Sequence, residues 1–118
     1  MTNAEIIQHV CKRPGMWMPG VELERVYAFL EGLHAGSGCL TGFREWLAPT
    51  VGNVASNIVW WGVVDALLDR EACPPDERIA RLGQLLDEFR QFVSAEPSHH
   101  GLMRVFVRYD AWLKARYS

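Results

Sequence analysis

The chain has 118 residues, a formal charge of −2 and a pI of about 6.1. Its composition, with 49% hydrophobic and 22% charged residues, excludes collagen, a coiled-coil rod and a disordered chain. The length suits a single domain over residues 1–118, and the slight negative charge argues against a dedicated nucleic-acid binder.

A first helix is predicted at the start of the chain. Thr2 and Glu5 form a capping-box pattern, and Pro14-Gly15 stops the helix. The segment 16–20 lies between two Pro-Gly pairs, which predicts a turn that carries Trp17. Trp17 is expected either to close the core from this turn or to form an exposed binding anchor.

A second helix is predicted from about Val21 to Gly36. Glu24 and Glu31 lie on the face opposite its apolar stripe, where solvent is expected. The stripe itself has clean helical spacing and consists of Leu23, Val26, Tyr27, Leu30, Leu33 and His34. His34 is therefore expected to be a buried histidine with satisfied hydrogen bonds.

Two helices are predicted in the middle of the chain. The first is short, covers 41–47 and is broken by Pro49 and Gly52. The second is expected from about Asn53 to Arg70, and its almost entirely apolar first half places it at the centre of the core.

Two further helices complete the predicted fold. After the break at 73–76, a helix runs to about Ala95, with Glu77 and Arg81 spaced to form an ion pair. The last helix begins near Ser98, and its expected core stripe is Leu102, Val105, Phe106, Tyr109, Trp112 and Leu113. No segment alternates like a strand, so the sequence predicts a compact all-α bundle of about six helices in one domain.

The sequence carries no motif for catalysis or cofactor binding. It contains no nucleophile elbow, phosphate-binding loop or dinucleotide fingerprint, so we expect neither an enzyme nor a cofactor. His99 and His100 are adjacent, and neighbouring side chains on a helix point about 100° apart, which does not suit a shared metal ion. The three cysteines form no C-x-x-C pair, so no metal site is expected from them.

A cytoplasmic location is expected. The amino-terminal segment lacks the basic and apolar regions of a signal peptide. The uncharged run over 48–64 is interrupted by proline, glycine and asparagine and is too short in its apolar part to cross a bilayer, so no membrane contact is expected. An odd number of dispersed cysteines suits a reducing compartment.

Charge is distributed unevenly along the second half of the chain. Residues 65–96 hold eight acidic and four basic side chains, whereas residues 99–117 carry a net charge of +3. One interpretation is that the acidic fifth helix and the basic sixth helix pack side by side. The other is an acidic patch that meets a basic partner.

Several short segments together resemble a family of small bacterial proteins. The segments are Lys12-Arg13-Pro14-Gly15-Met16-Trp17, Phe29-Leu30-Glu31-Gly32-Leu33, Phe43-Arg44-Glu45-Trp46-Leu47, Asn57-Ile58-Val59-Trp60 and Leu85 to Phe89. The first is similar to the R-P-G-M-aromatic segment of immunity-type proteins, some of which act in toxin competition systems. In that pattern a glycine directly follows the aromatic and aliphatic pair, whereas this chain has Met18-Pro19-Gly20 at that place.

The resemblance implies an immunity protein that binds one cognate toxin domain and blocks it without catalysis. An acidic, partly aromatic surface suits that role, and the expected partner-binding residues are Trp17, Glu24, Glu31, Asp87 and Glu88. The alternative is a small helical ligand-binding domain or enzyme, with a pocket near Trp60, His34 or His99.

Overall fold

The computed structural model describes residues 1–18, 22–55, 57–95 and 100–117, and 79% of the chain is helical. Its elements in chain order are α1 (Asn3–Lys12), η1 (Pro14–Met16), α2 (Leu23–Ser37), α3 (Phe43–Val51), α4 (Trp60–Arg70), η2 (Pro75–Glu77), α5 (Arg78–Ser94) and α6 (His100–Tyr117). Within these ranges there are six α-helices and no strand, which confirms the predicted all-α class. The predicted cap Ser98 and the histidine His99 lie outside the described residues.

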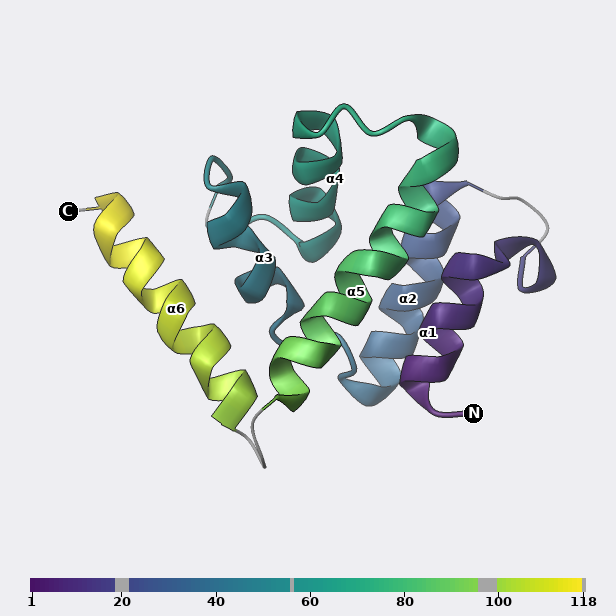
Figure 1. Cartoon of the computed structure of the whole chain (residues 1–118), viewed down its shortest axis with the longest axis horizontal. Helices are drawn as coiled ribbons and strands as arrows, with labels where there is room; N and C mark the ends of the chain where they lie inside the picture. The colour runs from purple at the N-terminus through teal and green to yellow at the C-terminus, as the bar shows by residue number, and fades with distance from the viewer. Residues whose placement is uncertain (19–21, 56, 96–99, 118) are drawn as a thin grey trace.

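Helix α5 crosses the front of the molecule diagonally and separates two groups of helices (Figure 1). On one side, α1 packs along α5 and α2 lies beside them; on the other, α3 packs against both α4 and α6. Helix α6 is the outermost element and flanks α3 (Figure 1). The amino and carboxyl ends of the chain lie on opposite sides of the bundle.

An aromatic cluster joins the helices at the centre of the core. The ring of Phe43 is fully buried and lies 5.4 Å from Phe89 on α5 and 6.1 Å from Trp60 on α4, measured between ring centres. Trp46 stacks beside it at 6.3 Å. Rings at these separations stabilise the core beyond their buried area. Among the described residues, further large side chains that are fully buried are Leu30, Leu47, Leu68, Leu82, Val10, Val26, Val63, Val64 and Val105.

Two glycines allow elements to approach closely. A Cβ atom at Gly83 on α5 would lie 2.8 Å from the Cβ of Cys11 on α1, so glycine sets how closely these helices pack. Gly42 precedes α3 with a φ of +88°, and a Cβ there would lie 2.6 Å from Leu102. Burial between α1 and α5 raises the pKa of the Cys11 thiol to about 12, so it stays protonated at neutral pH.

The boundaries of α3 and α4 differ from the prediction. Helix α4 begins at Trp60 rather than near Asn53, and Val59 directly before it has an extended backbone, with φ −69° and ψ 159°. Pro49 lies inside α3 and does not end it; the helix continues to Val51. A proline inside a helix removes one backbone hydrogen bond. The loss is tolerated here because α3 continues for only two residues after Pro49.

The predicted core role of Phe106 is wrong. Val105 is fully buried, but Phe106 is 42% exposed and lies beside exposed Met103 and Val107. Helix α6 contacts α3 and α5 on one side only. Because consecutive side chains on a helix point about 100° apart, the face that buries Val105 turns Phe106 towards solvent.

Candidate partner-binding site

A groove between α2 and α4 contains two of the five predicted partner-binding residues. Six residues line it: Glu24, Tyr27, Ala28 and Glu31 from α2, and Trp61 and Asp65 from α4. Spacings of three, four and seven residues place the α2 set on one helix face, and Trp61 and Asp65 are one helical turn apart. We call this feature, about 500 Å³ in volume, the α2–α4 groove.

Two hydrogen bonds connect the walls of the groove. The indole N–H of Trp60 donates to Glu31 Oε2 at 2.6 Å, and the hydroxyl of Tyr27 donates to Asp65 Oδ1 at 2.9 Å. The rings of Tyr27 and Trp60 meet edge to face at 5.4 Å. Each carboxylate is therefore held in place by an aromatic donor from the opposite helix, and both carboxylates are only half-buried.

The groove is electrostatically negative. Burial raises the pKa of Tyr27, and the hydrogen bond and charge of Asp65 raise it further, with a smaller contribution from Glu24. Tyr27 therefore keeps its proton and remains a donor to Asp65 at all physiological pH values. The six lining residues include three carboxylates and neither Lys nor Arg.

A second hollow, of about 360 Å³, adjoins the groove and shares Glu31 and Trp61 with it. It is also lined by Trp60 and His34, so the structure brings together two residues of the alternative pocket. His34 is half-buried rather than buried as predicted, and its Nδ1 accepts a hydrogen bond from the backbone N–H of Leu40 at 3.1 Å. His99 lies outside the described residues.

Trp17 takes an intermediate position between the two predicted alternatives. Its side chain is 36% exposed, its indole N–H donates to His9 Nδ1 at 2.7 Å, and its ring meets Phe29 edge to face at 5.7 Å. On α2, Phe29 lies about 140–160° around the helix axis from Glu24 and Glu31. Trp17 therefore packs on the side of α2 that faces away from the α2–α4 groove.

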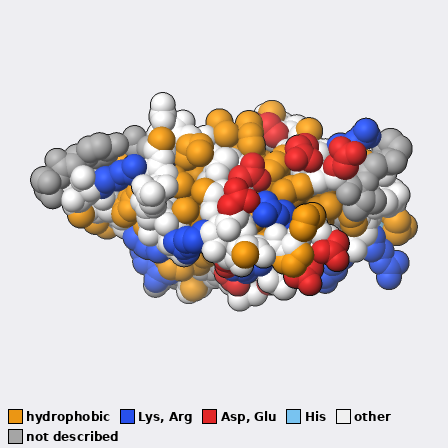
Figure 2. Space-filling model, turned by 90° about the horizontal axis from the view of Figure 1, so that it is seen from above, with side chains coloured by type: hydrophobic (Ala, Val, Ile, Leu, Met, Phe, Trp, Pro, Cys, Tyr) orange, Lys and Arg blue, Asp and Glu red, His pale blue; other side chains and the backbone are white. Residues whose placement is uncertain are grey.

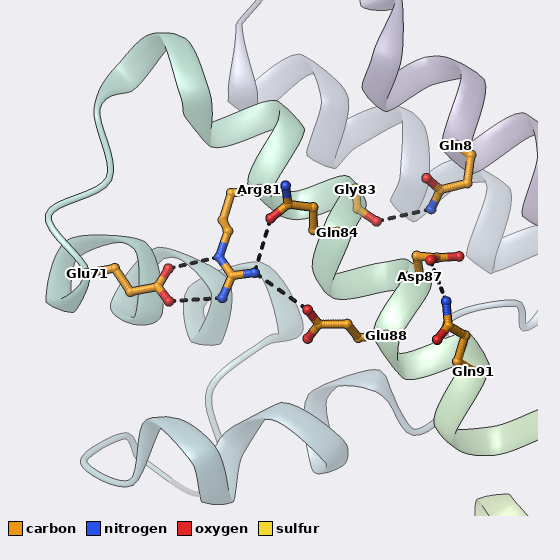
Figure 3. A network of polar contacts seen from close by, with 8 residues as sticks. All are labelled: Gln8, Glu71, Arg81, Gly83, Gln84, Asp87, Glu88 and Gln91. Atoms are coloured by element: carbon orange, nitrogen blue, oxygen red, sulfur yellow. Dashed lines mark hydrogen bonds and ion pairs between the residues drawn. The ribbon is translucent and has the colours of Figure 1, made fainter. Parts of the chain in front are cut away.

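Asp87 and Glu88 lie outside the groove, among ion pairs on both sides of α5 that we call the α5 ion-pair row. Figure 3 shows the two side chains on opposite sides of α5. Asp87 pairs with Arg90 at 2.8 Å, and Glu88 lies 3.9 Å from Arg81. The row consists of Glu71, Arg81, Asp87, Glu88 and Arg90.

Arg81 is the centre of this row. Its guanidinium donates twice to the carboxylate of Glu71, at 3.0 and 2.9 Å, and this bonding lowers the pKa of Glu71 (Figure 3). The predicted Glu77–Arg81 pair is wrong, because α5 begins at Arg78 and Glu77 belongs to η2. The helical spacing that would bring Glu77 to Arg81 is therefore lost.

Acidic side chains are confined to part of one face of the molecule. In Figure 2 they lie over the centre and right, where Lys and Arg also appear, whereas the left third, where α6 lies in Figure 1, shows Lys and Arg without acidic groups. Two arginines of α6 connect it to the rest of the fold. Arg108 donates to Trp46 O and Thr50 Oγ1, and Arg116 donates to Val54 O. These bonds hold α6 against α3 and the loop after it.

Three residues of the groove were not identified from the sequence. Tyr27 and Trp61 look like ordinary core residues in their helical stripes, and Asp65 looks like a solvated charge. The available signal was the spacing of Trp61 and Asp65, which predicts a shared face of α4. No pattern in the sequence shows that this face meets α2.

The segments that carry the family resemblance contribute mainly to packing. Trp17 of the first segment contacts Phe29 of the second, and Phe43 of the third contacts Trp60 and Phe89 of the fourth and fifth. These aromatic residues join α1, α2, α3, α4 and α5. Apart from Glu31, the resemblance therefore concerns the core rather than the lining of the α2–α4 groove.

The chain matches no known protein-family model, no curated protein sequence and no solved structure. Among the described residues, no three His, Cys, Asp or Glu side chains gather as a metal ion would require. In the same part of the chain, none of the helices combines the length and apolar character needed to cross a membrane.

Proposed function

We propose that this protein is an immunity-type inhibitor that binds a basic surface of a cognate toxin domain through the α2–α4 groove. The observation that carries the proposal is the lining of the groove, which presents Glu24, Glu31 and Asp65 beside an indole ring and contains no basic side chain. Three carboxylates that form no ion pair within the described residues complement a positively charged partner. The proposal involves binding alone and no catalytic step.

The local geometry supports recognition of another protein. Glu31 and Asp65 are held by Trp60 and Tyr27, so little side-chain entropy is lost when a partner binds. The half-buried indole of Trp61 offers an aromatic surface of the kind that anchors protein interfaces. By contrast, the carboxylates of the α5 ion-pair row already have arginine partners.

Charge reversal of Glu24 is the sharpest test of the proposal. Glu24 is exposed, whereas Glu31 accepts the Trp60 N–H, so only Glu24→Lys changes the charge without removing a hydrogen bond. We expect Glu24→Lys to slow association with the toxin about tenfold or more at low salt, with the difference shrinking at high salt. Glu77→Lys, an equal charge change on exposed η2, serves as the matched control.

The experiment pairs the protein with toxin domains encoded next to it in its genome. Binding kinetics are measured beside rescue of growth in cells that express the toxin. Slower association and weaker rescue by Glu24→Lys, with an unchanged Glu77→Lys, support the proposal. Equal effects of the two variants, or a lost rescue only in the double variant Asp87→Asn/Glu88→Gln, place the interface elsewhere. Failure of the unmodified protein to bind any neighbouring toxin refutes the immunity role.

A second candidate function is binding of a small cationic molecule. The observation that favours it is that two hollows, of about 500 and 360 Å³, share Glu31 and Trp61 as lining residues. Hollows of this size and aromatic character suit a small ligand. Thermal melting with a panel of small amines, in the absence of any protein partner, distinguishes this function: a saturable rise in the melting temperature supports it.

A further inference from the structure

We propose that the α2–α4 groove is an arginine-binding pocket, whose occupant is one arginine side chain projecting from the partner protein. The inference rests on the proposed function, because it names the group by which the toxin enters the groove. It follows from three features of the groove: the indole of Trp61, the oriented carboxylates of Glu31 and Asp65, and the apolar walls around them.

The first feature is the aromatic surface. Trp61 is half-buried, lines both hollows and meets the ring of Trp60 edge to face at 5.6 Å. This contact fixes the plane of the Trp61 indole relative to α4. A planar guanidinium stacks on such a ring and gains a cation–π interaction, which is strongest with tryptophan.

The second feature is the pair of oriented carboxylates. Each has one oxygen engaged by an aromatic donor, Glu31 Oε2 by Trp60 and Asp65 Oδ1 by Tyr27. Within the described part of the chain, the other oxygen of each receives no hydrogen bond, so it is available to a donor in the groove. Burial keeps Tyr27 protonated, which maintains this orientation of Asp65.

The third feature is the combination of charge with apolar walls. Tyr27, Ala28 and Trp61 line the groove beside the carboxylates, and the carbon chain of an arginine packs against such surfaces. Arginine carries five donors in a rigid plane and is more weakly hydrated than lysine. A groove with a ring, oriented acceptors and apolar walls therefore prefers guanidinium to ammonium, whereas exposed carboxylates alone attract both by charge.

The test uses the full chain and two neutral-ended probes, N-acetyl-arginine amide and N-acetyl-lysine amide. Each is titrated while the indole N–H resonances of Trp60 and Trp61 are followed by NMR. We expect saturable shifts with the arginine probe at millimolar concentrations, and binding of the lysine probe that is weaker by about fivefold or more. Equal affinities, or no shift with arginine up to about 50 mM, overturn the inference.

Three variants locate the pocket. Asp65→Asn and Glu31→Gln keep an acceptor for Tyr27 and Trp60 while they remove a charge, and each should weaken arginine binding about fivefold or more. Trp61→Leu should abolish the preference for arginine over lysine, a readout that a loss of charge does not move. Glu77→Gln on η2 is the control, and an equal loss in Glu77→Gln would show non-specific attraction.

Failure of this inference is distinguishable from failure of the proposed function. A toxin that binds the groove in the Glu24→Lys test while the probes bind with equal affinity refutes the arginine pocket and leaves the immunity role intact. Selective arginine binding without a toxin partner supports the arginine pocket and refutes the immunity role. An arginine pocket further requires that substitution of one arginine on the toxin weakens the complex more than any single lysine substitution does.

Discussion

The α2–α4 groove and the α5 ion-pair row are both acidic, yet their carboxylates are bonded in opposite ways. In the groove, Glu31 and Asp65 accept hydrogen bonds from an indole and a phenol. In the row, Glu71 and Asp87 are paired with arginines. A phenol or indole orients a carboxylate without cancelling its charge, whereas an arginine neutralises it.

The difference shows that acidic residues in a sequence do not by themselves mark a binding surface. Glu31 and Asp87 both carry a carboxylate, and the sequence predicts that both bind a partner. Among the described residues, Asp87 forms an ion pair, whereas Glu31 forms none and lies in a hollow of the surface. Four changes test this contrast through the free energy of unfolding, measured in urea.

The largest effect is expected for Trp60→Phe in the groove. The change removes the N–H that Glu31 accepts and leaves a gap at a ring that is only 7% exposed. We expect a loss of about 2–3 kcal/mol in the free energy of unfolding. Trp61→Phe, at a half-buried position, should cost less than about 1 kcal/mol. Equal losses would mean that the Trp60–Glu31 bond does not orient the groove.

A smaller loss is expected for Tyr27→Phe. The buried ring stays in place, but Asp65 loses the hydroxyl that donates to it at 2.9 Å. Because Asp65 is half-buried and regains some hydration, we expect a cost of about 1–2 kcal/mol. An unchanged midpoint in urea would show that water replaces the Tyr27 hydroxyl fully.

Glu71→Gln probes the α5 ion-pair row and should cost about 0.5 kcal/mol at pH 7, since the pair with Arg81 is partly exposed and screened. Arg81 lowers the pKa of Glu71 in the folded protein. The stabilisation is therefore present above the ordinary carboxyl pKa and is lost as the pH falls through the lowered folded value. Urea melts at pH 7 and pH 3 should show the difference between variant and unmodified protein shrinking in acid.

The smallest effect is expected for Glu24→Gln. The change relieves repulsion from Glu31 and Asp65 in the groove, but it also removes a favourable negative charge from the first turn of α2. We expect the two contributions to offset each other to within about 0.3 kcal/mol at low salt. A loss of stability as large as that in Glu71→Gln would mean that Glu24 has a favourable partner in the fold and that the two surfaces do not differ.

Local features of the fold were predictable because they depend on neighbours along the chain. The Thr2–Glu5 capping box forms as predicted, with hydrogen bonds of 3.1 and 3.2 Å. Apolar spacing placed the helices, and spacing by seven residues put Glu24 and Glu31 on one face of α2. The predicted start of α4 is wrong, because a run of apolar residues does not show that the backbone is still extended at Val59.

The partners across the groove were decided only by tertiary structure. Tyr27 meets Asp65 across 38 residues of sequence, and Glu31 meets Trp60 across 29. Helical periodicity determines which side chains share a face, but not which face of another helix it will meet. The packing of the helices around the aromatic core at Phe43 decides which faces meet. The same packing leaves Phe106 exposed on α6. The sequence by itself therefore determined the helices and the charge of the α2 face, whereas long-range packing decided that this face borders a groove.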